Sequence, residues 1–246
     1  MPLTQTAHRP WPLPPQPWIM AMGWHDLLFM HWPVRAEALR DFIPRQLSID
    51  TFDGTAWIAV VPFRMSGVRP RITPALPRVS AFPELNVRTY VTAGGKPGVW
   101  FFSLDAGDPL AVETARNIFH LPYYNARMAC QPQGAAIRYT SERSHRDARP
   151  ATFGGCYAPT GPAYRSAPGT LEHWLTERYC LYAANRRGQI WRGEIQHAPW
   201  PLQPAEAEIE RNTMTAQIGL KLPDTRPLLH FARSLAVLAW WPHRLA

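Results

Sequence analysis

Prolines and glycines interrupt this chain so regularly that long helices have little room to form. The 27 prolines and 15 glycines are spread over all 246 residues. Because proline disrupts a helix interior and both residues favour turns, this spacing favours many short strands joined by turns. Hydrophobic residues make up 46% of the chain, enough for a sizeable core. We therefore expect a mainly β protein, a β-rich α+β fold with a few short helices.

The first 17 residues differ in composition from the rest of the chain. They are rich in proline, with the run RPWPLPPQP, and are expected to form an extended N-terminal arm. An arm packed along its own domain is favoured over a proline-rich ligand for another protein. No linker-like stretch interrupts the sequence after this arm, so residues 18–246 are expected to form a single domain.

Neither a signal peptide nor a membrane helix is expected. The N-terminus lacks a basic start followed by an uninterrupted apolar run. The longest apolar stretch, residues 18–34, contains His25, Asp26 and His31, which a membrane helix would not tolerate. The three cysteines, Cys130, Cys156 and Cys180, are odd in number and show no CxxC spacing. We therefore expect a cytoplasmic protein without disulfides.

The basic character of the chain comes almost entirely from arginine. The formal net charge is +8, but the only lysines are Lys96 and Lys221. Nucleic-acid-binding surfaces usually mix lysine and arginine in runs, and no run of five basic residues occurs. Nucleic-acid binding is therefore not expected, and arginines that hold carboxylates or solvate the surface are favoured. The nine histidines form no HExxH or HxH spacing, so we predict no metal and no cofactor.

Local signals divide the chain into strands, helices and irregular segments. Asp108 and Pro109 open the clearest helix, which extends to about Phe119, since aspartate caps free N–H groups and proline fits the first helical position. Shorter helices are expected at 36–42 and 171–176. Strands are expected at 18–32, 56–65, 82–92, 99–105, 135–143, 179–184, 189–197 and 228–240. Segments 66–80, long enough for a flap, and 144–168 are expected to be irregular.

The strand at 82–92 carries the most informative pattern. Because side chains alternate along a strand, Glu84, Asn86, Arg88 and Tyr90 share one face and an apolar set shares the other. The simplest interpretation is a surface strand whose polar face lies in water. If that face instead points into a barrel, Glu84 is a candidate acid or base and Arg88 a candidate anion holder.

A second cluster follows the predicted helix at its C-terminal end. It surrounds the Leu-Pro step at 121–122 and comprises Arg116, His120, Tyr123, Tyr124 and Arg127. By pattern alone this segment is a helix C-terminus with aromatic packing.

Several motifs together resemble one known family. The segments GTAWIAVVPFRM, FPELNVRTYV, VWFFSLDA, LPYYNARM and LTERYCLYA resemble the YqjF-like bacterial family, a domain of unknown function (2071) grouped with the acetoacetate decarboxylase-like superfamily. The resemblance spans nearly the whole chain. It implies a closed or cone-shaped antiparallel β-barrel with a few flanking helices, and a homo-oligomer, since related barrels often assemble symmetrically.

The resemblance also implies which chemistry is missing. Acetoacetate decarboxylases carry a helix-exit motif of the form G-R-E-x-x-G-x-P-K-K. The matching stretch here keeps Arg116 and Pro122 but has Tyr123 and Tyr124 in place of the two lysines. In those enzymes the first lysine forms a Schiff base with the substrate and the second lowers its pKa. A phenol cannot form an imine, so Schiff-base decarboxylation is not expected, while Glu84 resembles a glutamate inside the decarboxylase barrel.

Two functions for a small-molecule site remain open at this stage. One is a lysine-independent enzyme that acts on a small carboxylate or carbonyl compound. The other is a non-catalytic metabolite sensor or carrier that uses the same cavity. For the enzyme, the candidate catalytic residues are Glu84 and Tyr123, and the candidate substrate-binding residues are Asn86, Arg88, Tyr90, Arg116 and Tyr124.

Overall fold

Strands dominate the computed structural model, which describes residues 5–74 and 81–245. The strands are β1 (Met20–Val34), β2 (Ser48–Ile49), β3 (Ala56–Pro70), β4 (Phe82–Ala93), β5 (Lys96–Ala106), β6 (Tyr123–Gln133), β7 (Ala136–Arg143), β8 (Thr152–Pro159), β9 (Cys180–Ala184), β10 (Ile190–Gln196), β11 (Gln203–Asn212), β12 (Leu228–Ala239) and β13 (His243–Arg244). The helices are α1 (Ala36–Arg40), α2 (Pro109–Ile118), α3 (Leu171–Thr176) and the 3-10 turn η2 (Met214–Ile218). The predicted mainly β class is confirmed. No helix in the described ranges combines the length and the apolar character needed to cross a membrane.

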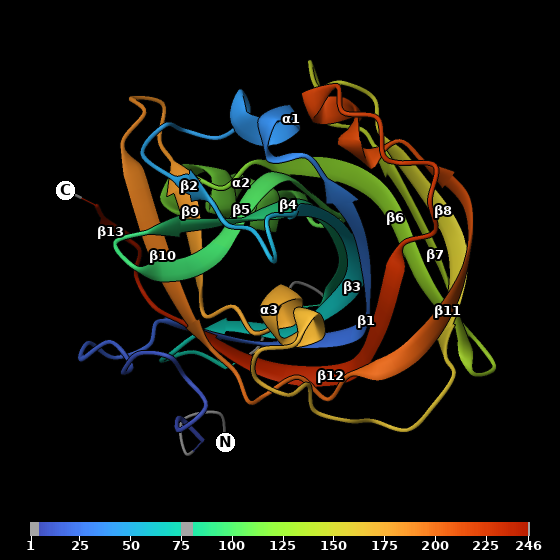
Figure 1. Ribbon diagram of the computed structural model, residues 1–246, viewed down its shortest axis with the longest axis horizontal. Coiled ribbons are helices and arrows are strands. Elements are labelled where there is room, and N and C mark those ends of the chain that lie inside the picture. The colour runs from blue at the N-terminus through green and yellow to red at the C-terminus, as the bar shows by residue number, and fades with distance from the viewer. Residues whose placement is uncertain (1–4, 75–80, 246) are drawn as a thin grey trace.

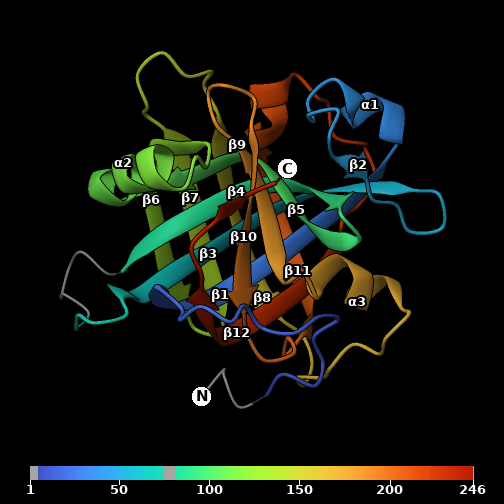
Figure 2. The same cartoon turned by 90° about the vertical axis from the view of Figure 1, so that its left-hand side faces the viewer.

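Hydrogen-bonded strand neighbours close the sheet into two rings that share one wall. The shared wall has the order β12–β1–β3–β4–β5. Strands β9 and β10 join its ends on one side and form what we call the small ring, while β6, β7, β8 and β11 join them on the other and form the large ring (Figure 1). Helices α2 and α3 lie on opposite sides of the molecule (Figure 2).

The barrel is closed as expected, but it is not purely antiparallel. Strand β5 pairs in parallel with β6 and with β9, whereas the other pairings are antiparallel. The parallel pairing of β5 with β6 arises because α2 lies between them in the chain. That helix provides the crossover a parallel pair requires, whereas a tight turn would give an antiparallel hairpin.

The two faces of the shared wall enclose different surroundings. Leu85 and Val87 of β4 belong to the core of the large ring, together with Tyr139 and Tyr157 from β7 and β8. The intervening side chains of β4 face the small ring, whose apolar residues include Phe29, Phe63, Val61 and Trp200. The alternation predicted for residues 82–92 therefore separates two interiors, rather than one core from solvent.

Besides the two-residue strands β2 and β13, three strands lie where the sequence predicts irregular structure or no strand. β8 falls inside the segment 144–168, and Gly155 explains why its signal is weak. A Cβ at Gly155 would approach the Glu208 carbonyl oxygen of β11 to 2.7 Å, so the close packing of these strands requires glycine. β11 alternates small and acidic residues, which are poor strand formers, and β6 follows the helix exit without a turn signal.

Strand β3 is longer and helix α1 shorter than predicted. β3 continues to Pro70 because β1 pairs with it along that extension, with Gly23 opposite Ser66 and Met20 opposite Pro70. The first part of the predicted flap is therefore strand, and its residues 75–80 lie outside the described ranges. Helix α1 ends at Arg40, two residues before the predicted end at residue 42. Helix α3 has its predicted bounds, and Asp108 caps α2 through a 2.8 Å bond from the Ala111 N–H.

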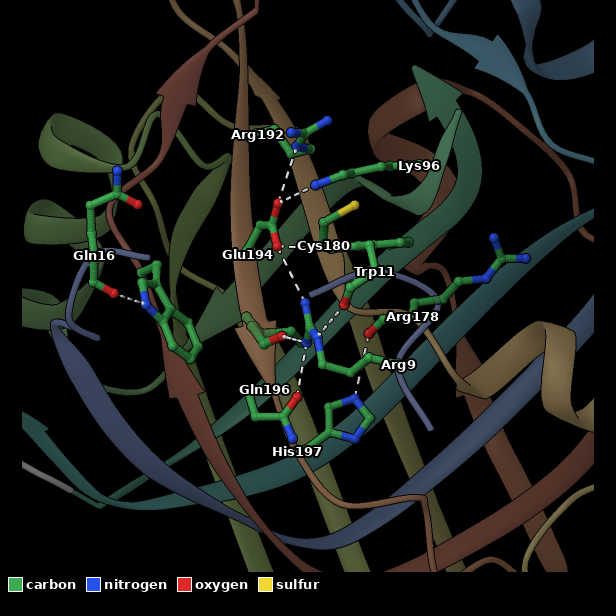
Figure 3. Close-up of polar contacts among 12 residues, drawn as sticks. Arg9, Trp11, Gln16, Lys96, Arg178, Cys180, Arg192, Glu194, Gln196 and His197 are labelled. Carbon is green, nitrogen blue, oxygen red and sulfur yellow. Dashed lines mark hydrogen bonds and ion pairs between the residues drawn. The ribbon is translucent and has the colours of Figure 1, made fainter. Parts of the chain in front are cut away.

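The N-terminal arm lies against β10 through a buried arginine (Figure 3). The Arg9 guanidinium donates to the Gln196 side-chain oxygen at 2.9 Å and to Glu194 Oε2 at 3.2 Å. Trp11 Nε1 donates to the same Glu194 oxygen at 2.8 Å, and Lys96 Nζ lies 2.9 Å from the other. The described part of the arm is thus attached by charged hydrogen bonds in addition to apolar contact.

Replacing Arg9 by methionine is expected to lower the free energy of unfolding by about 2 kcal/mol, because hydrogen bonds to a charged group contribute about 1.5–3 kcal/mol. Urea unfolding measures this loss, and faster chymotryptic cleavage after Trp18, at the end of the arm, would show that the arm has detached. The matched control is Arg35→Met, which removes a pair with Glu37 whose side chains are 86% and 75% exposed. Equal stability of the two variants would contradict a stabilising role for the arm.

Candidate functional site

The polar face of β4 is enclosed within the small ring. Glu84 is 3% exposed, Asn86 5%, Arg88 8% and Tyr90 0%. The enclosure follows from strand pairing, since β3 and β5 flank β4 on both edges and the ring curves over its polar face. This burial excludes the surface-strand interpretation. Buried polar groups need partners, so the contacts of each side chain decide what this face can do.

Glu84 and Tyr123 form a hydrogen-bonded pair at one end of this face. Tyr123 begins β6 opposite Leu104 of β5, and its hydroxyl donates to Glu84 Oε2 at 2.7 Å. Burial raises the pKa of Glu84 to about 8, although the bond from Tyr123 acts in the opposite direction. Burial and the neighbouring Glu84 raise the pKa of Tyr123 well above its ordinary value. At neutral pH Glu84 is therefore largely a neutral acid that can donate a proton.

Arg88 is a buried cation in the middle of the small ring. Direct pairing across the wall places His31, Ala59, Arg88 and Phe101 in one row from β1 to β5. The Arg88 guanidinium lies 5.2 Å from the centre of the Phe29 ring, and its Nε has no hydrogen-bond partner. Within residues 5–74 and 81–245 no carboxylate lies within ion-pair distance of it.

Further polar atoms without partners belong to residues of the small ring. They are Asn86 Oδ1, His31 Nδ1, His230 Nδ1 and Trp200 Nε1. The other nitrogen of His31 is bonded to the Tyr90 hydroxyl at 2.8 Å, and the His31 and His230 rings lie 6.4 Å apart. Burial lowers the pKa of both histidines, so both are neutral near pH 7. Buried polar groups are ordinarily satisfied by protein, water or a bound group, so these atoms need a partner beyond the described side chains.

Arg178 shows how a second buried arginine in this ring differs from Arg88. It forms a 2.6 Å ion pair with Asp50, and its guanidinium lies 4.3 Å from the Trp174 ring centre of α3 and 4.9 Å from that of Tyr90. Arg178 therefore has a carboxylate partner and a structural role at this end of the ring. Arg88, by contrast, has no partner among the described carboxylates.

The structure does not bring Arg116 and Tyr124 together with Glu84. Tyr123 and Tyr124 are consecutive in a strand and point to opposite faces, so only Tyr123 faces the small ring. Arg116 and Tyr124 line a separate cleft of about 710 Å³. The predicted set therefore divides into five residues in the small ring and two in the cleft.

No sequence motif singled out His31 or His230. His31 shares a face of β1 with Phe29, and His230 of β12 lies directly opposite Phe29. The alternation of side chains along β1 places His31 on the same face as Phe29, but no local pattern links His230 to His31. No lysine reaches the pair at Glu84, because Lys96 is bonded to Glu194 and Lys221 lies beside exposed Asp224. No group of three or more potential metal ligands occurs among the described residues.

Solved structures with the same arrangement of strands identify the class of fold. A structure of acetoacetate decarboxylase aligns over 94% of this chain and 90% of its own, with a TM-score of 0.62 and 13% identity. The enduracididine biosynthesis enzyme MppR, complexed with pyruvate, aligns over 95% and 92%, with a TM-score of 0.63 and 11% identity. The chain thus has an acetoacetate decarboxylase-like fold. Sequence identities this low support a shared fold and nothing further.

Sequence comparison then identifies the family. The DUF2071 model, described as an uncharacterized conserved protein, matches residues 21–236, and the chain belongs to this family. The "Uncharacterized protein YqjF" of Bacillus subtilis (strain 168) is 47% identical over 223 residues, which is 91% of each chain.

Proposed function

We propose that this protein binds a small organic acid inside the small ring, with the carboxylate of the ligand held by Arg88. The observation that carries this proposal is a buried guanidinium with no carboxylate partner in the described chain. An unpaired buried charge is costly, and a bound carboxylate would offset that cost through two parallel N–H···O bonds. Asn86, His31 and His230 supply further polar groups for the rest of the ligand.

Glu84 and Tyr123 extend this proposal from binding to proton transfer. A carboxyl group with a pKa of about 8 holds a proton at neutral pH and can give it to a bound carbonyl or enolate oxygen. Tyr123, hydrogen-bonded to the same carboxyl, is placed to orient it. Neither side chain forms an imine, so the proposed chemistry is acid–base catalysis without a Schiff base. The complex of MppR with pyruvate supports a small 2-oxo acid as the first ligand to test.

Replacing Arg88 by methionine is expected to weaken pyruvate binding at least about 30-fold, because losing one partner of a buried charged pair costs 2 kcal/mol or more. Isothermal titration calorimetry with pyruvate and acetate measures the loss. The free variant should be as stable as wild type or more stable, since methionine removes an unpaired buried charge. Arg165→Met, at an exposed position, is the matched control. Equal affinities of wild type and the Arg88 variant would refute the proposal.

A non-catalytic sensor or carrier would use the same contacts, and turnover separates the two functions. A panel of small 2-oxo acids is incubated with wild type and with Glu84→Gln, and product is followed by NMR. Turnover by wild type that is lost in the variant supports acid–base catalysis by Glu84. Binding without turnover in both proteins supports the sensor or carrier.

A further inference from the structure

The cleft that contains Arg116 and Tyr124 is a second concave site outside the small ring. Its volume of about 710 Å³ lies within the range typical of small-molecule pockets. Three arginines line it, Arg116 from α2 and Arg186 and Arg187 from the turn between β9 and β10, and its described lining includes no aspartate or glutamate. Aromatic walls are supplied by Phe42 and Trp100. The cleft therefore combines positive charge with flat apolar surface.

None of these arginines is neutralised within residues 5–74 and 81–245. Arg116 donates to the Tyr123 carbonyl oxygen at 2.5 Å, which fixes its direction without cancelling its charge. Arg186 and Arg187 are exposed and form no ion pair with any described carboxylate. The positive charge of the cleft is thus available to an anion.

A hydrogen-bond chain orients Tyr124 as a donor in this cleft. Asp105 and Arg143 form a fully buried ion pair, and Arg143 also donates to Gln217 Oε1 at 2.9 Å. Because arginine can only donate, the amide of Gln217 must turn its oxygen to Arg143 and its nitrogen to Tyr124. Gln217 Nε2 then donates to the Tyr124 hydroxyl oxygen at 2.9 Å. The phenol accepts this bond, and its own O–H remains available to an acceptor in the cleft.

We propose that this cleft binds an organic phosphate that carries an aromatic ring. A phosphate monoester carries about −1.5 to −2 charges at pH 7 and three acceptor oxygens, which matches several guanidinium groups better than a single carboxylate does. The Tyr124 O–H supplies a directed donor to the same group, and Phe42 and Trp100 supply surface for the ring. This site differs from the small-ring site in its residues and in the charge of its ligand.

The test is calorimetric titration of the full-length protein with phenyl phosphate, with benzoate as a ligand that has the same ring but a single charge. The double variant R186Q/R187Q is expected to weaken phenyl phosphate binding tenfold or more. Tyr124→Phe, which removes only the hydroxyl, is expected to weaken it several-fold. Arg165→Gln, an exposed arginine outside the cleft, and Arg88→Met should both bind phenyl phosphate as wild type does.

Each outcome of this experiment supports or overturns the site. The proposed site is supported if phenyl phosphate binds more tightly than benzoate and if only the cleft variants lose affinity for phenyl phosphate. No binding at millimolar concentration, or equal binding by wild type and the double variant, overturns it. Weaker phenyl phosphate binding by Arg88→Met alone would place the phosphate in the small ring, and this result would also overturn the proposed cleft site. Pyruvate binding is measured on the same samples, so failure of the cleft and failure of the small-ring site are distinguished.

Discussion

The stability of the wild-type protein relative to its Glu84→Gln variant is expected to fall by about 3.5 kcal/mol as the pH rises from 5 to 8. Burial raises the folded pKa of Glu84 from 4.5 to about 8. Between these values the folded protein holds a proton that the unfolded chain has released. Unfolding therefore becomes more favourable by about 1.4 kcal/mol for each pH unit, and glutamine, which does not titrate, lacks this dependence.

The comparison with glutamine isolates Glu84 from other buried groups. Burial lowers the pKa of His31, His197 and His230, so the unfolded state binds more protons below pH 6.5 and these residues make stability rise with pH. They are present in both proteins and cancel in the difference. Glutamine also keeps an oxygen that accepts the Tyr123 hydroxyl. Urea unfolding at pH 5, 6, 7 and 8 gives the result, and a difference independent of pH would show that the pKa of Glu84 is not raised.

Asp105→Asn is expected to lower the free energy of unfolding by about 4 kcal/mol, because removing one partner leaves a buried charge uncompensated. The side chains of Asp105 and Arg143 are 0% and 1% exposed, and Arg143 donates to one carboxylate oxygen at 2.6 Å from Nη2 and 3.0 Å from Nε. The pair joins β5, the edge strand of the shared wall, to β7. Urea unfolding at pH 7 measures the loss.

Two further variants test whether burial is the cause. Glu142→Gln breaks the pair with Arg127, whose side chains are 58% and 73% exposed, and should cost less than about 1 kcal/mol. The double variant Asp105→Leu/Arg143→Met removes both buried charges and should recover much of the lost stability. Similar losses for Asp105→Asn and Glu142→Gln would contradict the buried ion pair.

Local pattern predicted the class of fold and most of its strands. Alternation and turn residues placed β4, β7, β9 and β12 to within a few residues, since these signals depend on neighbours in the chain. It missed β8 and β11, because glycine at a close strand approach and alanine–glutamate alternation are poor local signals for strands. β8 and β11 stabilise each other by pairing, and the sequence of one strand alone does not show which strand it pairs with.

For the site, the sequence by itself determined which side chains share a face and which chemistry is absent. Glu84, Asn86, Arg88 and Tyr90 lie together because the period of a strand is two residues, and the two positions directly after Pro122 hold tyrosine in place of lysine. Only the tertiary structure decided that this face is enclosed, that Arg88 has no carboxylate partner in the described chain, and that Tyr123 joins Glu84 while Tyr124 does not. The reason is physical: alternation is set by the local backbone, whereas enclosure and charge pairing depend on strands distant in sequence that close each ring.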